Sequence, residues 1–237
     1  MSAHVIWHDV ECGGYTADLP LWQELAAAAD GPVLDVGAGT GRVALALAAA
    51  GHAVTALDLD PELLAELERR AAAAGVRVET VVADAAAFDF AGRDFGLVAV
   101  PMQTIQLLGE RDGFFAATRR ALAPGGLVAL ALAASAETFE DPAELPQPDV
   151  GEHDGWRYVS QPVALRLRPG VMRIERVREL VAPDGTRSAR DDVIELRTLT
   201  AAQLAAEAAP HGLRPEPSRH VAATDDHIGS EVVMLRG

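Results

Sequence analysis

The chain of 237 residues lacks several residue types that particular chemistries require. Cys12 is its only cysteine, so an intramolecular disulfide is impossible and the composition fits an intracellular protein. All 20 basic residues are arginine, and the absence of lysine excludes a Schiff-base lysine, a phosphate-loop lysine and a lysine general base. Asparagine is absent as well, which excludes every mechanism that depends on it.

Long apolar runs are also missing. No run reaches the roughly 18 residues that a membrane-spanning helix needs, since Asp30 and Gly75 interrupt the alanine-rich stretches. The first ten residues lack the basic and then apolar pattern of a secretory signal, so we expect a cytoplasmic protein. They carry His4 and His8 at i,i+4 spacing, but nothing completes a metal site, and a solvated terminus without metal is expected.

The net charge of −15 argues against two classes of partner. A strongly acidic surface repels phosphate backbones and anionic lipid, so neither nucleic acid nor a membrane is expected. A local exception is a group of arginines between positions 166 and 178, for which a solvated strand face is the expected location. These are Arg166, Arg168, Arg173, Arg176 and Arg178.

The first half of the chain alternates short apolar segments with helical ones. This alternation predicts a parallel sheet with helices on both faces. One helix has clear limits, because Asp60 is a typical N-cap before Pro61, and Gly75 stops the helix. The expected strands are Pro32–Val36, Ala53–Leu59, Val76–Ala83, Phe95–Val100 and Leu127–Leu132, and the other expected helices are Val43–Ala50 and Asp112–Leu122.

From about Ser135 the pattern changes to strands separated by turns. An acidic, proline-rich loop is expected over Glu140–Pro148, followed by an antiparallel meander. Thr200 and Gln203 form a capping box at the start of the last helix. We therefore predict a single domain over 1–237, with an N-terminal lid or helix over 1–30 and a β-rich insertion over 135–199. The expected strands here are Trp156–Leu167, Val171–Val181, Val193–Leu199, Leu213–Val221 and Glu231–Leu235.

The most informative segment is a buried strand that runs through a glycine-rich turn into a helix. Asp35 precedes three alternate glycines, Gly37, Gly39 and Gly41, which let the backbone bend sharply and approach a ligand. The next two strands end at Asp58 and Asp84. A carboxylate after the second strand can accept both hydroxyls of a ribose, and one after the third can reach an adenine amine.

This arrangement resembles the class I S-adenosylmethionine-dependent methyltransferases. Asp35 and the glycines match the D-x-G-x-G-x-G motif of that family, Asp58 its ribose-binding acid, and Asp84-Ala85 its adenine-contacting pair. The resemblance implies S-adenosyl-L-methionine as cofactor and a Rossmann-like, seven-stranded, mostly parallel sheet between helices, with an antiparallel last strand. It also implies which residues bind the cofactor: Tyr15, Asp35, Gly37, Ala38, Gly39, Gly41, Asp58, Leu59, Asp84, Ala85 and Pro101.

The resemblance identifies the cofactor better than the methyl acceptor. Methyl transfer from a sulfonium is an in-line displacement that mainly needs alignment and exclusion of water, so a general base is optional. The absence of asparagine and lysine excludes the N-P-P-Y motif of some amino-methylating enzymes and the lysine-based tetrad of some RNA 2′-O-methyltransferases. Together with the acidic charge, this favours a small-molecule acceptor, methylated at nitrogen, oxygen or carbon. We expect the protein to be a monomer or a homodimer.

Candidate acceptor residues follow the fourth strand and lie in the insertion. Gln103, Gln106 and Trp156 are candidates for binding the acceptor, and Gln103, His153 and Tyr15 for catalysis. Structural roles are the alternatives: an amide that caps a loop, a packed aromatic ring, or a solvated loop histidine. Two other functions stay open, a nicotinamide-dependent oxidoreductase and a non-catalytic S-adenosylmethionine-binding protein.

Overall fold

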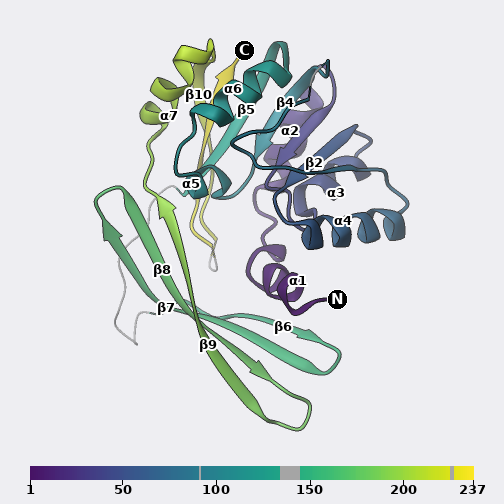
Figure 1. Ribbon diagram of the computed structural model, residues 1–237, viewed down its shortest axis with the longest axis vertical. Coiled ribbons are helices and arrows are strands. Elements are labelled where there is room, and N and C mark those ends of the chain that lie inside the picture. The colour runs from purple at the N-terminus through teal and green to yellow at the C-terminus, as the bar shows by residue number, and fades with distance from the viewer. Residues whose placement is uncertain (91, 134–144, 225–226) are drawn as a thin grey trace.

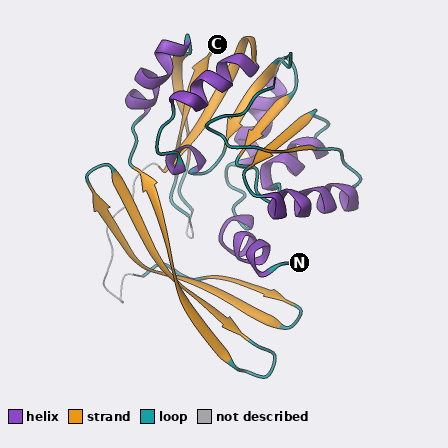
Figure 2. Ribbon diagram, viewed as in Figure 1, coloured by secondary structure: helices purple, strands orange, loops and turns teal. Residues whose placement is uncertain are grey.

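The computed structural model describes residues 1–90, 92–133, 145–224 and 227–237, which form two β-sheets and the helices around them (Figures 1 and 2). The larger sheet has seven strands in the order β10-β11-β5-β4-β1-β2-β3. Its strands are β1 Val33–Val36, β2 Val54–Asp58, β3 Glu79–Val82, β4 Phe95–Val100, β5 Leu122–Ala133, β10 Arg214–Val221 and β11 Ser230–Arg236. Strand β11 is antiparallel to both neighbours, β5 and β10, so the predicted fold is confirmed.

Helices cover both faces of this sheet. On one face, α6 and α7 pack through Phe114, Phe115 and Leu204. On the other, α2, α3 and α4 bury side chains that include Trp22 and Leu47. The helices, in chain order, are α1 Ala3–His8, α2 Leu19–Ala28, α3 Arg42–Ala49, α4 Pro61–Ala74, α5 Thr104–Leu107, α6 Asp112–Ala121 and α7 Ala201–Ala208; short π and 3-10 turns follow at Asp9–Gly13 and Ala209–His211.

The strand order places the functional edge of the sheet between β1 and β4. The chain runs outward from β1 through β2 to β3, and then returns to β4 on the opposite side of β1. Strands β1 and β4 are parallel neighbours, with Asp35 opposite Ala99, so their carboxyl ends diverge into separate connections. Open α/β sheets bind ligands at such a switch point.

Two helix starts follow from local sequence. The Asp60 carboxylate accepts hydrogen bonds from the backbone N–H groups of Glu62 and Leu63, with Pro61 at the first position of α4. Gly75 ends this helix in a left-handed conformation. The predicted capping box of α7 is also present, since the Thr200 hydroxyl accepts from the backbone N–H of Gln203 and the Gln203 amide oxygen accepts from that of Thr200.

The insertion forms a second, four-stranded antiparallel sheet in the order β6-β7-β8-β9. Its strands are β6 Asp149–His153, β7 Trp156–Arg168, β8 Val171–Val181 and β9 Arg187–Arg197. Strand β6 was not predicted, and β9 begins six residues before the expected Val193 because continuous pairing with β8 extends the strand through polar residues. Of the loop expected over Glu140–Pro148, residues 140–144 lie outside the described part, and 145–148 have no regular structure.

The N-terminal segment, residues 1–13, consists of α1 and the π-helical turn Asp9–Gly13. It lies between the large sheet's α4 side and the insertion sheet (Figure 1). Trp7 packs edge-on against Tyr158 of β7, with ring centroids 5.0 Å apart. Among the described residues, no helix has the length and apolar character needed to cross a membrane.

Candidate functional site

A cavity of about 330 Å³ opens at the carboxyl ends of β1 and β4. Four parts of the chain form its walls: the N-terminal segment, the glycine loop after β1, the loop Pro101–Thr104 after β4, and the inner faces of β8 and β9. Asp35, Gly37, Ala38, Pro101 and Gln103 line it, so the structure brings these predicted residues together. The cavity therefore joins the carboxyl edge of the large sheet to the insertion.

The glycine loop is held between two helices. Gly37 and Gly39 have φ values of 73° and 55°, in the region that favours glycine. A Cβ on Gly37 would lie 2.5 Å from Thr104 Cγ2, and one on Gly39 would lie 2.5 Å from two atoms of the His8 ring. Glycine at these positions lets the loop's backbone approach α5 and α1 closely.

Carboxylates and exposed apolar side chains mark the ends of β2 and β3. Asp58 accepts hydrogen bonds from the backbone N–H groups of Gly39, at 2.7 Å, and Asp60, at 2.9 Å. Leu59 is 70% exposed, and Val82, which pairs with Asp58 across the strands, is 57% exposed. An apolar surface beside a fixed carboxylate suits the adenosine part of a nucleotide ligand.

Beyond the end of β3, Asp84 accepts a hydrogen bond from the backbone N–H of Ala86 at 2.8 Å. Ala85 lies within the same short turn. The predicted adenine-contacting pair is therefore next to the exposed surface formed by Leu59 and Val82.

Asp35 is a buried carboxylate that faces the cavity. Only 1% of the residue is exposed, and neither carboxylate oxygen has a hydrogen-bond partner among the described residues. Burial raises the pKa of Asp35 to about 7, although the nearby Arg42 guanidinium and the backbone N–H of Ala44, which points toward the carboxylate without hydrogen-bond geometry, act to lower it. Unpaired buried carboxylates are costly, so the site is prepared for a hydrogen-bonding or cationic ligand group.

Arg42 lines the cavity near Asp35 and is fixed by residues that precede β1. Its guanidinium forms a two-pronged ion pair with Asp18 and donates to the backbone carbonyl of Tyr15 at 2.9 Å. The Tyr15 ring is buried, with the Arg42 guanidinium 5.1 Å from its centroid and the His227 ring, tilted by 33°, 4.8 Å away. Tyr15 does not line the cavity, so its predicted cofactor contact stays a prediction.

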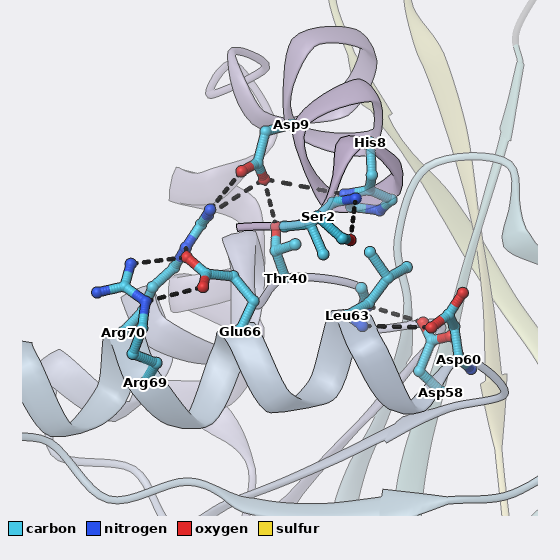
Figure 3. A network of polar contacts seen from close by, with 12 residues as sticks. Ser2, His8, Asp9, Thr40, Asp58, Asp60, Leu63, Glu66, Arg69 and Arg70 are labelled. Atoms are coloured by element: carbon cyan, nitrogen blue, oxygen red, sulfur yellow. Dashed lines mark hydrogen bonds and ion pairs between the residues drawn. The ribbon is translucent and has the colours of Figure 1, made fainter. Parts of the chain in front are cut away.

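The N-terminal segment is attached to the large sheet by polar contacts (Figure 3). Asp9 accepts from the Thr40 hydroxyl at 2.7 Å and pairs with Arg70, and His4 contacts Asp60 at 2.7 Å. Burial acts to raise the pKa of Asp9, but His8, Arg70 and Thr40 together lower it to about 2.

The expectation of a solvated N-terminus holds for residues 1–4, which are exposed, but was wrong for Val5, Ile6 and Trp7, which are buried. His4 and His8 both line the cavity, because the partners of this segment are distant in sequence and α1 folds across the glycine loop.

A buried ionic cluster attaches the same segment to the insertion sheet. The Glu11 carboxylate, 6% exposed, forms a two-pronged pair with Arg178, at 2.7 Å for both contacts, and also pairs with Arg176 at 3.0 Å. The Ser160 hydroxyl donates to Glu11 at 2.8 Å, and Asp192 pairs with both arginines. The positive charges of Arg176 and Arg178 therefore balance the negative charges of Glu11 and Asp192.

The solvated strand face expected for the arginines was therefore wrong for two of them. Arg176 and Arg178 stand two residues apart on the inner face of β8, and their side chains are 15% and 16% exposed. Arg173 lies on the opposite face, paired with Glu175 and Glu195. Strand alternation alone could not show which set meets Glu11.

The loop after β4 forms the wall nearest the glycine turn. Pro101, Met102, Gln103 and Thr104 line the cavity. Met102 has a φ of 54°, an uncommon left-handed conformation for a residue with a side chain. Such local strain is concentrated at functional sites, where surrounding packing maintains it.

The other predicted acceptor residues lie away from the cavity wall. The Gln106 side chain is buried and bonded to two backbone groups. His153, the last residue of β6, has its Nε2 atom 3.2 Å from the Asp154 carboxylate. Trp156, which is 39% exposed, lies opposite His153 in the β6–β7 hairpin. Of Trp156, Arg157 and Tyr158, only Tyr158 is buried. The acceptor and catalytic roles of these residues stay predictions.

The sequence analysis missed several wall residues from the N-terminal segment and the insertion. They include Trp7, Glu11, Cys12, Arg176, Ile194 and Leu196. A period-two pattern on β8 and β9 was the available signal, since Met172, Ile174, Arg176 and Arg178 share one face. Within the described ranges, no group of three or more histidine, cysteine or acidic side chains is placed to hold a metal ion.

Comparisons with known proteins match different lengths of the chain. Residues 33–126 match a family described as a methyltransferase domain. Two uncharacterized proteins of Mycobacterium tuberculosis are 48% identical over 66 residues and 38% identical over 109 residues. These matches cover 28% and 44% of this chain, but only 24% and 39% of the relatives' own length.

Solved structures extend the similarity to nearly the whole chain. The glycopeptide N-methyltransferase MtfA, in complex with S-adenosyl-L-homocysteine, is 26% identical with a TM-score of 0.63, covering 99% of this chain and 98% of that one. The amino pentose methyltransferase CalS10 of Micromonospora echinaspora, with S-adenosylmethionine bound, is 22% identical with a TM-score of 0.70, covering 100% and 97%. The sugar N-methyltransferase KedS8 of Streptoalloteichus is 22% identical with a TM-score of 0.70, covering 100% and 94%. The latter two similarities establish the fold alone.

Proposed function

We propose that the chain is a class I S-adenosylmethionine-dependent methyltransferase that methylates a small molecule held in the cavity. One observation carries the proposal. The cavity has a nucleotide-type wall, made of the glycine loop and Asp35, and faces a second wall that belongs to the insertion. A donor bound at the first wall would present its reactive group to a molecule bound at the second.

The residues present fit the cofactor. Gly37 and Gly39 allow backbone approach where a Cβ would collide with neighbouring side chains, and Asp58 is fixed at the end of β2 to accept ribose hydroxyls. The unpartnered Asp35 carboxylate would accept the α-ammonium of the methionine part. When bound, the cofactor supplies an activated methyl group on a sulfonium.

The protein's part in the reaction is alignment and exclusion of water. Methyl transfer requires the acceptor atom in line with the bond that breaks, and positioning alone contributes several kcal/mol to such reactions, about 7–11 in favourable cases. Ile194 and Leu196 of the insertion, together with Trp7 of α1 and Leu107 of α5, make much of the cavity lining apolar, which suits water exclusion. Gln103 lies on the wall between the two halves and would orient a polar acceptor group.

The acceptor class is supported by both charge and relatives. A net charge of −15 disfavours nucleic acid. MtfA is named for a glycopeptide nitrogen, and CalS10 and KedS8 for an amino pentose and a sugar nitrogen. Amines on small, sugar-like molecules are therefore the first acceptors to test, with hydroxyl compounds second.

Calorimetry followed by an acceptor screen tests the proposal. We expect micromolar binding of both S-adenosylmethionine and S-adenosylhomocysteine, no binding of NADH, and transfer of labelled methyl to at least one compound of an amine and hydroxyl panel. Binding without transfer across that panel would favour a non-catalytic cofactor-binding protein. NADH binding without binding of S-adenosylmethionine would favour the oxidoreductase.

A further inference from the structure

Helix α5, Thr104–Leu107, is a single turn at the edge of the large sheet (Figure 1). Its side chains contact three different parts of the site. Thr104 packs so closely on the glycine loop that a Cβ on Gly37 would lie 2.5 Å from its Cγ2 atom. Ile105 is fully buried in the core, and Leu107 faces the cavity. The helix directly follows the strained loop that contains Met102.

The fourth side chain, Gln106, connects α5 to the insertion. Its amide nitrogen donates to the backbone carbonyl of Arg197 at 2.9 Å, and its amide oxygen accepts from the backbone N–H of Ala133 at 2.9 Å. Ala133 is the last residue of β5, where the chain leaves the large sheet, and Arg197 is the last residue of β9, where it returns. One buried carboxamide, 3% exposed, thus fastens both ends of the insertion.

These contacts require an uncharged amide of this length. A carboxamide offers both a donor and an acceptor, whereas a glutamate at this position could accept from Ala133 but not donate to Arg197, and a methionine could do neither. Because the site is buried, losing either contact leaves a backbone group without its partner, which is costly.

We propose that Gln106 is a positioning residue that sets the acceptor wall relative to the methyl donor, an inference that rests on the proposed function. The inner face of β8 and β9 contributes Ile194 and Leu196 to the acceptor side of the cavity. Thr104 contacts the glycine loop, at which the methyl donor would bind. Gln106, two residues later on α5, contacts Arg197 at the end of β9. In-line transfer is sensitive to such alignment, since a misplacement of about 1 Å costs roughly a hundred-fold in rate.

Hydrogen exchange on Gln106→Glu and Gln106→Met tests this role without a known acceptor. We expect the amides of β9 near Arg197 to exchange about ten-fold faster in both variants, and the Ala133 amide to do so in Gln106→Met, which removes its acceptor, while amides of β1 and β4 keep their wild-type rates. The affinity for S-adenosylhomocysteine should stay within two-fold by calorimetry. Phe114→Leu is the control, because it creates a cavity in the core beside α6 and touches neither end of the insertion.

Two results would overturn the proposal. Unchanged exchange at Ala133 and β9 would show that Gln106 does not fasten the insertion. Faster exchange that also spreads to β1 and β4, as expected for Phe114→Leu, would reduce Gln106 to an ordinary core residue. With an acceptor from the panel, both Gln106 variants should lose at least ten-fold in kcat with an unchanged KM for S-adenosylmethionine. Failure of the panel would count against the proposed function and leave the exchange result standing.

Discussion

Asp35 and Asp58 lie near the carboxyl ends of neighbouring strands of one sheet, yet their surroundings differ. Asp58 accepts two backbone hydrogen bonds, whereas Asp35 has no partner among the described residues, and its burial raises its pKa to about 7. A carboxyl whose pKa rises on folding retains a proton that the unfolded chain has already released. Stability is therefore lost as the pH rises from about 4 to about 7.

Asp35→Asn should remove that loss. The shift from 3.8 to about 7 corresponds to a contribution on the order of 4 kcal/mol. We expect the variant to be more stable than wild type at pH 8 in urea unfolding, with the difference shrinking toward pH 4. The same substitution should weaken the binding of S-adenosylmethionine. The affinity of the wild-type protein should fall as the pH drops below 7, since the protonated carboxyl cannot pair with the α-ammonium of the cofactor. Equal pH dependence of both proteins would contradict this assignment.

Asp58 is predicted to matter for the ligand more than for the fold. Asp58→Ala removes the acceptor for ribose hydroxyls and should weaken cofactor binding by tens-fold, given about 1.5–3 kcal/mol for a hydrogen-bonded charged group. Asp60→Ala is the matched control two residues away, because Asp60 caps α4. Calorimetry should show a nearly unchanged affinity for this control, and denaturation a stability loss of about 1 kcal/mol. Similar affinities for the two variants would place the ribose elsewhere.

At the scale of elements, the N-terminal segment carries one acid for each half of the site. Asp9 contacts the large sheet's side through Thr40 and Arg70 (Figure 3). Glu11 contacts the insertion through Arg178. Glu11→Gln leaves two largely buried arginines with Asp192 as their remaining anion. Removing one partner of a buried ion pair lowers the free energy of unfolding by about 3–5 kcal/mol. Because both arginines keep their pairs with Asp192, we expect a loss near the lower end of this range.

The expected result of Glu11→Gln is lower stability in denaturant together with faster proteolytic cleavage within residues 1–18. Glu24→Gln serves as the control, since Glu24 pairs with Arg219 on the surface and such pairs contribute little. Wild-type cleavage rates in the Glu11 variant would show that the segment is held by Trp7 and its apolar neighbours instead.

The elements also show which features a sequence can predict. The α4 cap at Asp60 and the capping box of Thr200 and Gln203 were predictable because all their atoms lie within one helical turn. The glycine loop was predictable because its conformation requires glycine. The location of the N-terminal segment could not be predicted. Its Asp9 is 61 residues from its partner Arg70, and its Glu11 is 167 residues from Arg178. Neither pairing leaves a local pattern.

At the scale of the whole molecule, the two sheets are predicted to unfold together. The insertion has only small apolar clusters of its own, and one of them is completed by Ile6 and Trp7 of the N-terminal segment against Tyr158. The cavity takes walls from both sheets. A ligand bound there therefore stabilises both sheets, provided that it contacts both or holds the N-terminal segment between them.

Thermal unfolding with S-adenosylhomocysteine tests this coupling. At a ligand concentration of 100 times Kd, mass action stabilises the folded chain by about 2.7 kcal/mol. For a chain of this size, that corresponds to an increase in Tm of roughly 5–10 °C. We expect one transition, shifted upward as a whole and equally by far- and near-ultraviolet circular dichroism, with a much smaller shift for Asp58→Ala at the same ligand concentration. Two transitions, of which the ligand moves only one, would show that the insertion sheet unfolds independently and that the cavity couples the sheets only weakly.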